Sequence, residues 1–214
     1  MDRLLHLSVR DFHAATASDR FYPGGGCVSA LAGALAGALG QMVLRLTIGK
    51  KKYAPFEGEL KALQPQIATL ADELLQCVER DAEGCEAMLA AMALPKASDG
   101  EKEARQKAMA EASKTANVAP LRVCELSLQL LRLLCDNVGK VNSNCLSDWA
   151  VAAQQALAAL EGAALNARIN APGVPEPGYA GRLRVKLEQE LGEGRKLWSL
   201  LRDRVHASLD QPAG

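Results

Sequence analysis

Residues 21–53 read FYPGGGCVSALAGALAGALGQMVLRLTIGKKKY, and this stretch decides the fold. It opens with aromatic residues, a proline and three glycines, and it carries no charge from Gly24 to Leu44. Alanine and leucine dominate it, and both are strong helix formers. Small residues recur along one flank: Ala30, Gly33, Gly37 and Gly40. Because small residues let another helix backbone approach closely, we expect a tightly packed central helix over about residues 26–48.

The Pro-Gly-Gly-Gly segment at 23–26 admits two interpretations. Consecutive glycines expose backbone N–H groups, and the following helix would point the positive end of its dipole at the loop, which outlines a cradle for an anion or polar ligand. The alternative is an ordinary turn before a buried helix, because the spacing of a Walker loop is absent. Taken alone, the stretch favours the turn.

Composition indicates the fold class of the whole chain. Its 214 residues include 25 basic and 25 acidic side chains, 49% apolar residues and only 4% aromatics. The charge balance argues against a general nucleic-acid or anionic-membrane surface. A core made mostly of Ala and Leu is typical of all-α proteins. Because no linker divides the chain, we expect a single domain over 1–214, a multihelical bundle with one long central helix.

Several classes of site and location are disfavoured by pattern. The six cysteines form no CxxC pair and the three histidines no HxxxH pattern, so we expect reduced thiols and no metal site. The N-terminus MDRLLHLSVRD lacks the apolar segment of a signal peptide. The run at 24–44 approaches transmembrane length, but its alanines and glycines make it only weakly hydrophobic. We expect a cytoplasmic protein without a membrane span.

Apolar residues at helical spacing predict the remaining helices, over about residues 8–18, 56–92, 98–135, 144–170 and 181–208. Two prolines fall inside these ranges. Pro65 predicts a kink or a helix that starts beside it, and Pro120 predicts a kink or break near residues 117–119. The last helix alternates charges with leucines and should pack as an amphipathic cover.

Asp81 continues the apolar stripe of the helix over 56–92. The stripe's members share steps of three and four: Leu60, Leu63, Ile67, Leu70, Leu74 and Cys77. An unpaired carboxylate on a buried face is costly unless it is partnered or neutralised. Asp81 therefore either forms an ion pair with a Lys or Arg of another helix or has a function, and its position favours function.

A second polar pattern lies on the helix over 144–170. Asp148 and Asn166 point the same way, because the residues between them make about five helical turns, and Gln155 and Asn170 lie close to that line. Such a stripe faces either solvent or a polar groove. An exposed face usually carries Lys and Glu, which are missing here, so the pattern favours a groove between helices.

Five segments in order resemble the cyclodeaminase domain of formiminotransferase-cyclodeaminase: PGGGCVSALAGALAGAL, LTIGKKKY, DAEGCEAMLAAMALPK, NSNCLSDWAVAA and GAALNARIN. That family also includes stand-alone bacterial methenyltetrahydrofolate cyclohydrolase-like proteins. The resemblance covers nearly the whole chain, without the formiminotransferase half. It implies an all-helical bundle, an antiparallel homodimer, and a folate site near the PGGG loop at the subunit interface.

The implied activity concerns the one-carbon unit between N5 and N10 of tetrahydrofolate. The enzyme would either hydrolyse 5,10-methenyltetrahydrofolate to 10-formyltetrahydrofolate or cyclise 5-formiminotetrahydrofolate with release of ammonia. Neither reaction needs a cofactor beyond the tetrahydrofolate substrate. Two alternatives stay open: an unrelated hydrolase of another cyclic amidine, and a non-catalytic helical dimer that binds a folate or a protein partner.

The resemblance also assigns roles to residues. We predict that Asp81 is the catalytic acid/base, because burial would raise its pKa toward the working range. Asp148 is the second catalytic candidate and would orient pterin or water. The predicted substrate-binding residues are Gly24, Gly25, Gly26, Cys27, Lys50, Lys51, Lys52, Asn144 and Asn166. The lysines would attract the glutamate tail or simply end a helix, and Cys27 stands where the family usually has Ser, although a thiol hydrogen-bonds poorly.

Overall fold

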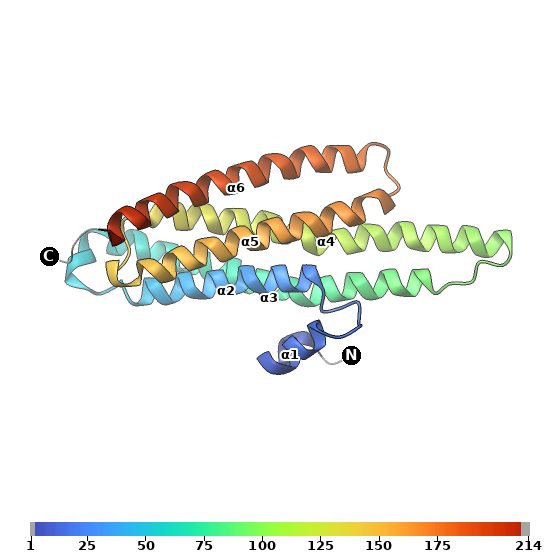
Figure 1. Ribbon diagram of the computed structural model, residues 1–214, viewed down its shortest axis with the longest axis horizontal. Helices are drawn as coiled ribbons and strands as arrows, with labels where there is room; N and C mark the ends of the chain where they lie inside the picture. The colour runs from blue at the N-terminus through green and yellow to red at the C-terminus, as the bar shows by residue number, and fades with distance from the viewer. Residues whose placement is uncertain (1–2, 211–214) are drawn as a thin grey trace.

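Long α-helices make up most of the computed structural model, which describes residues 3–210 (Figure 1). The α-helices are α1 (Val9–Thr16), α2 (Gly25–Arg45), α3 (Glu57–Met92), α4 (Asp99–Asn137), α5 (Leu146–Asn170) and α6 (Tyr179–Leu209). Short 3₁₀ turns lie between them: η1 (Leu4–His6), η2 (Lys51–Phe56), η3 (Ser143–Cys145) and η4 (Ala171–Gly173). No strand occurs within residues 3–210, so the all-α prediction is confirmed.

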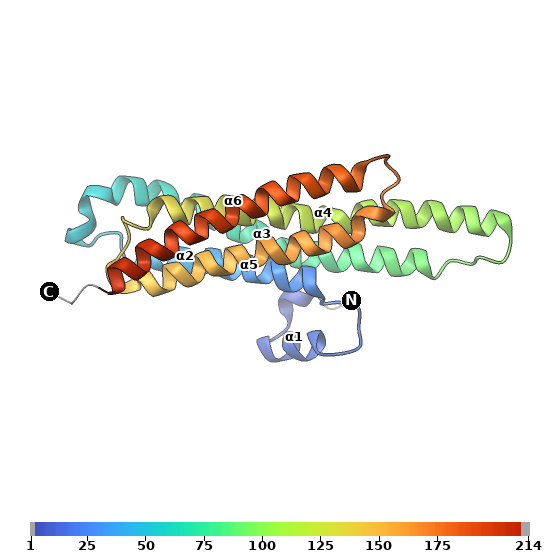
Figure 2. The ribbon, with the colours of Figure 1, turned by 45° about the horizontal axis from the view of Figure 1, so that its top comes forward.

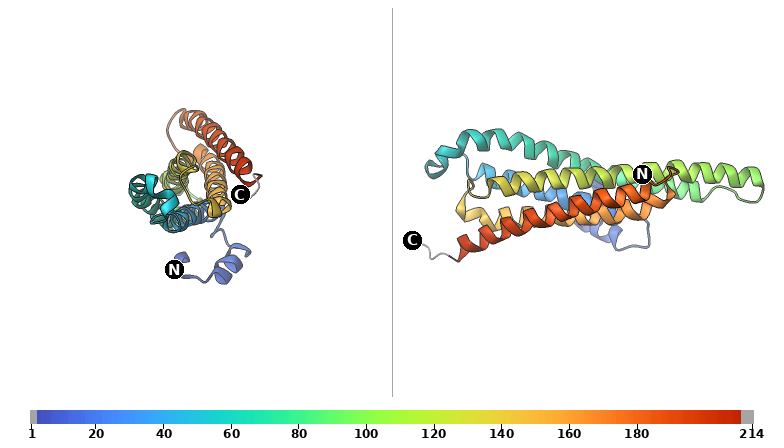
Figure 3. Two further views of the ribbon diagram at one scale, coloured as in Figure 1. Left: turned by 90° about the vertical axis from the view of Figure 1, so that its left-hand side faces the viewer. Right: turned by 90° about the horizontal axis from the view of Figure 1, so that it is seen from above.

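Helices α2, α3, α4 and α5 pack side by side as the body of the bundle (Figures 1 and 2). Helix α6 lies along α4 and α5 and buries Leu183, Leu187 and Leu201, as expected of an amphipathic cover. The α3–α4 hairpin extends beyond α2 and α5 at one end (Figure 1). Short helix α1 stands off the bundle and has no buried residue (Figure 3).

The small residues of α2 bring it into close contact with α3. A Cβ added at Gly37 would lie 2.6 Å from the Cβ of Ala71, and one added at Gly33 would lie 3.0 Å from the Cδ2 of Leu74. The expected tight packing of this helix is therefore confirmed, but with 21 residues α2 is the shortest of the four bundle helices rather than one long central helix. It ends at Arg45, earlier than predicted, and the chain turns through residues 46–50.

Gly37→Ala is expected to lower the free energy of unfolding by about 1–3 kcal/mol, the usual cost of overpacking a dense contact. Denaturant unfolding monitored by circular dichroism measures it. Gly58→Ala is the matched control, because Gly58 is also helical and an added Cβ there would meet nothing within 4 Å. A Gly37→Ala protein as stable as the Gly58→Ala protein would contradict the close α2–α3 approach.

Helix α4 is continuous through Pro120, so the predicted break near residues 117–119 is not present. Pro120 has no N–H to donate to the carbonyl of Ala116, four residues earlier. The side chain of Asn170 replaces that donor: its Nδ2 lies 3.0 Å from the Ala116 oxygen. A tertiary hydrogen bond from α5 thus satisfies the carbonyl that the proline leaves open.

The second interior proline, Pro65, does not mark the start of a helix. Pro65 lies inside α3, which already begins at Glu57. Among the six helices, α2 is long and apolar enough to cross a membrane by length and composition alone, but 56% of its most apolar window is buried inside the bundle. All six cysteines are free. Within residues 3–210, no group of three His, Cys, Asp or Glu side chains could hold a metal ion.

Candidate active site

The site is built around the first turn of α2. Gly24 is the N-cap residue and offers no side chain to the N–H groups of that turn. Asp81 of α3 takes this place: its carboxyl accepts a hydrogen bond from the backbone of Cys27. The positive end of the α2 dipole points at the same carboxyl. The glycine loop therefore meets a carboxylate of the protein itself.

Gly26 makes this approach possible. A Cβ at position 26 would lie 2.0 Å from Oδ1 of Asp81, well inside any allowed contact. The side chain of Cys27 adds a second contact, with its Sγ 3.3 Å from Oδ2 of Asp81. Gly26 therefore leaves room for the Asp81 carboxyl, and the thiol of Cys27 contacts Oδ2 of that carboxyl.

A cavity of about 160 Å³ opens beside Asp81. It is lined by Phe21 and the glycine loop and by residues from three further helices, α3, α4 and α5: Phe21, Gly24, Gly25, Gly26, Asp81, Cys85, Met88, Ala116, Asn166 and Asn170. Asn166 lies across from the loop, because a Cβ on Gly25 would be 3.2 Å from its Nδ2. That nitrogen donates to the carbonyl of Gly162 at 2.8 Å, which fixes the amide on α5.

The electrostatics of Asp81 suit proton transfer. Burial raises the pKa of its carboxyl, and the hydrogen bonds from Cys27 oppose this only in part. No charged side chain of the described residues contributes to the shift, so the ion pair considered as an alternative is not formed there. A half-buried carboxyl with a raised pKa and no cationic partner is a candidate acid/base group.

Cys27 is fully buried and stays a thiol. Burial and the neighbouring Asp81 both raise its pKa, so a reactive thiolate is disfavoured. Its single S–H hydrogen lies between two acceptors, Oδ2 of Asp81 and the carbonyl oxygen of Val78 at 3.4 Å. Because a thiol is a weak donor, it stabilises the ionised carboxylate less than a hydroxyl would.

Cys27→Ser is expected to lower the pKa of Asp81, because a hydroxyl donates a stronger hydrogen bond to the charged form. If Asp81 acts ionised, as a base, the acid limb of the pH–rate profile moves to lower pH. A ¹³C-NMR titration of the Asp81 carboxyl gives the same quantity without turnover. An acid limb and an Asp81 titration curve that stay at the same pH, or move to higher pH, would contradict this interaction between Cys27 and Asp81.

Four of the predicted positions meet at this cavity as neighbours of Asp81: Gly24, Gly25, Gly26 and Asn166. Cys27 lies directly beside it through its contact with Asp81. Asn170 and Phe21 also line the cavity, although the sequence did not single them out as site residues. The signal for Asn170 was present, because it follows Asn166 by one helical turn on the same polar stripe.

The other predicted residues lie at the opposite end of the bundle. Asp148 is in the first turn of α5, about 27 Å along the helix axis from Asn166. Lys52 is at the same end, since its Nζ lies 3.2 Å from Oγ of Ser143, next to Asn144. Within one chain, the lysines, Asn144 and Asp148 therefore do not reach the cavity of Asp81.

Comparison with known proteins places this geometry in a family. A family model described as formiminotransferase-cyclodeaminase matches residues 8–189. The chain belongs to this family. The resemblance predicted from the five sequence segments is confirmed, and the cavity beside Asp81 is built from three of them.

Known proteins of this family align with most of this chain. It is 37% identical over 190 residues to a methenyltetrahydrofolate cyclohydrolase of Methylorubrum extorquens, covering 89% of this chain and 91% of that protein. It is 30% identical to the formimidoyltransferase-cyclodeaminase of Sus scrofa, over 95% of this chain but 38% of that longer protein. The crystal structure of the formiminotetrahydrofolate cyclodeaminase of Thermotoga maritima superposes with a TM-score of 0.82 at 25% identity, covering 96% of this chain and 99% of that one.

Proposed function

We propose that the protein is a folate one-carbon enzyme that acts at the carbon between N5 and N10 of tetrahydrofolate. Either it hydrolyses 5,10-methenyltetrahydrofolate to 10-formyltetrahydrofolate, or it cyclises 5-formiminotetrahydrofolate with release of ammonia. The observation that carries the proposal is the half-buried Asp81 carboxyl, which faces a cavity without a cationic partner, in a family whose members have both activities.

Asp81 can serve either reaction by shuttling a proton. In the hydrolysis, water attacks the electrophilic carbon and ionised Asp81 accepts a proton from that water; Asp81 then returns the proton to N5 as the bond from the carbon to N5 breaks, and the remaining hydroxyl proton is released as the formyl C=O forms. In the cyclisation, N10 attacks the formimino carbon, protonated Asp81 donates its proton to the departing ammonia, and the resulting carboxylate accepts the proton that N10 loses. The Asn166 amide, fixed by Gly162, would orient the pterin or the water. Both routes are proton transfers without oxidation or reduction, so we propose no cofactor beyond the folate.

Two assays on the purified protein test the proposal. The loss of the near-ultraviolet absorbance of methenyltetrahydrofolate reports hydrolysis, and ammonia released from formiminotetrahydrofolate reports cyclisation. We expect acceleration over buffer in at least one assay, and the pair decides which reaction the protein performs. No acceleration in either assay would overturn the enzyme proposal and would favour a non-catalytic folate-binding or protein-binding dimer.

We further propose that the protein is a homodimer formed through α2 and α5. On α2, Val28, Leu35 and Met42 are seven residues apart and remain 42%, 55% and 37% exposed. On α5, Val151 and Leu165 are likewise exposed, at 45% and 65%. A seven-residue apolar repeat is the pattern that packs against another helix in coiled coils and bundles. Because both stripes lie on neighbouring helices, a second copy of the same surface would cover them.

An antiparallel arrangement of the two copies would also complete the site. It would bring the Gly24 end of one α2 toward the Arg45 end of the other. Lys50, Lys51, Lys52, Asn144 and Asp148 of the second subunit would then approach the cavity that they cannot reach within their own chain. For this reason we propose that these five residues belong to the site of the dimer. We also propose that the dimer works in the cytoplasm.

Leu35→Arg is expected to convert the dimer into a monomer, because it places a charge at the centre of the exposed α2 stripe. Size-exclusion chromatography with light scattering measures the mass. Val185→Arg is the matched control, since Val185 is 50% exposed on α6, away from the proposed interface. A native protein that is already a monomer, or a Leu35→Arg protein that stays dimeric, would contradict this interface.

A further inference from the structure

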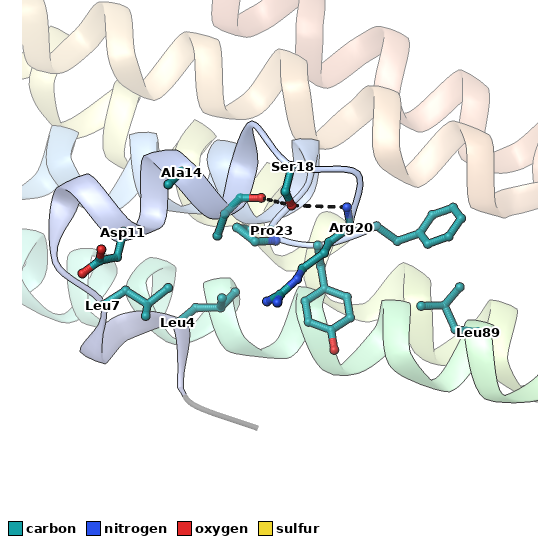
Figure 4. Close-up of a pocket in the computed structure, with 11 residues that line it drawn as sticks. Leu4, Leu7, Asp11, Ala14, Ser18, Arg20, Pro23 and Leu89 are labelled. Atoms are coloured by element: carbon teal, nitrogen blue, oxygen red, sulfur yellow. Dashed lines mark hydrogen bonds between the residues drawn. The ribbon is translucent and has the colours of Figure 1, made fainter.

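A groove lies beneath the N-terminal segment, next to the candidate active site (Figure 4). Its volume is about 760 Å³, and it runs between α1, the loop before α2, and α3. Its lining includes Leu4, Leu7, Arg20, Phe21, Pro23 and Leu89. Most of this lining is apolar, and Arg20 provides a positive charge.

The groove adjoins the cavity of Asp81. Phe21 lines both spaces, and Leu89 of the groove follows Cys85 of the cavity by one turn of α3. The cavity, at about 160 Å³, is smaller than the roughly 300–1,000 Å³ of sites that enclose a whole small ligand. A ligand of the size of a folate would therefore place one ring beside Asp81 and continue into an adjoining space.

The groove offers an aromatic surface for the next part of such a ligand. Phe21 is 72% exposed, so its ring is accessible to a ligand. A second aromatic residue, Tyr22, lines the same groove, and its hydroxyl donates to Glu86 at 2.7 Å, which fixes the ring. Exposed aromatic faces of this kind stack favourably on aromatic ligand rings.

Arg20 supplies the anion-binding group of the groove. Figure 4 shows its side chain reaching along the groove toward Leu4, while its backbone N–H donates to Oγ of Ser18 at 3.3 Å. Within residues 3–210, no carboxylate lies within 4.0 Å of its guanidinium. A guanidinium that has no carboxylate partner within the described residues can form a bidentate pair with a ligand carboxylate. Asp11 also lines the groove and would repel a second carboxylate, so the site fits one carboxylate best.

We propose that this groove binds the p-aminobenzoylglutamate part of the folate, with the benzoyl ring against Phe21 and a glutamate carboxylate on Arg20. The inference rests on the proposed folate activity and extends it to the substrate tail. It also supplies a tail-binding group in the same chain as Asp81. Lys50–Lys52 could serve the tail only from a second subunit.

Steady-state kinetics of Arg20→Met test the proposal with two substrates. One is methenyltetrahydrofolate, and the other is its analogue in which a neutral amide replaces the glutamate. We expect Arg20→Met to raise KM about tenfold for the first substrate and to leave kcat and the KM of the analogue unchanged. Arg10→Met is the matched control, because Arg10 is an exposed arginine on α1 that does not line the groove.

Direct binding of p-aminobenzoylglutamate, followed by NMR line broadening, separates this inference from the enzymatic proposal. We expect Phe21→Ala and Arg20→Met each to weaken binding at least about fivefold, and Arg10→Met to leave it unchanged. If these changes occur while both activity assays fail, the subsite stands and the enzyme proposal falls. Equal binding by the native and Arg20→Met proteins would overturn the subsite. So would a KM effect that appears in a Lys50→Met/Lys51→Met/Lys52→Met protein and not in Arg20→Met.

Discussion

Asp81→Asn is expected to lower kcat by at least about 100-fold, the usual contribution of a positioned acid/base group. The amide has nearly the shape of the carboxyl, and its oxygen can still accept the hydrogen bond from the Cys27 backbone. The start of α2 should therefore keep its partner while proton transfer is lost. The methenyltetrahydrofolate and ammonia assays measure the effect.

The same substitution should stabilise the fold at neutral pH. Burial raises the pKa of Asp81, so the ionised form is disfavoured in the folded state. Its contribution to stability is therefore fully present below the ordinary carboxyl pKa and is lost as the pH rises through the raised value. Asp81→Asn has no carboxyl to ionise and so does not lose this stability. The free energy of unfolding of the Asp81→Asn protein should therefore exceed that of the native protein at pH 7, and the difference should disappear in acid.

A matched control separates this effect from a general loss of charge. Asp72 lies on the same helix as Asp81 and is exposed, so Asp72→Asn should change neither turnover nor the pH dependence of unfolding. Full activity in Asp81→Asn would show that the acid/base assignment is wrong even though the family is right. Lower activity together with lower stability at pH 7 would instead indicate that Asp81 mainly holds the start of α2 in place.

The helical fold and the partly buried position of Asp81 could be predicted because both depend on local periodicity. The Ala- and Leu-rich segments specify helices. A carboxylate at a position of the apolar stripe is recognisable from the sequence alone, because its neighbours at helical spacing are all apolar. The second polar stripe groups residues that a single chain does not bring together, for a physical reason. Asp148 and Asn166 share a helix face, but angular agreement says nothing about the distance of about 27 Å along the axis.

Contacts between distant segments could not be predicted in the same way. The sequence predicted a kink or break near Pro120, but the donor for the open carbonyl of Ala116 is Asn170, fifty residues after the proline. The N-terminal helix was expected, whereas the groove that it forms with α3 depends on how the loop before α2 directs the chain. Such contacts are set by tertiary packing, which a single sequence read by periodicity does not contain.

Gly26→Ala is expected to reduce kcat by about 100-fold without a large loss of stability. The added Cβ would lie 2.0 Å from Oδ1 of Asp81, so the carboxyl must move, and a displacement of about 1 Å can cost that much in rate. The backbone itself tolerates alanine, because Gly26 is helical and is not among the glycines with positive φ. Gly37→Ala should show the opposite result, with lower stability and retained turnover.

The decisive comparison combines Gly26→Ala with Asp81→Asn. If the glycine acts only by making room for the carboxyl, its effect should nearly vanish once that carboxyl has been replaced, because the two changes remove the same function. Turnover of the double variant should then match that of Asp81→Asn alone. Independent, multiplying losses would mean that Gly26 contacts the folate directly, and the glycine loop would then be a ligand cradle in its own right as well as the seat of the catalytic carboxyl.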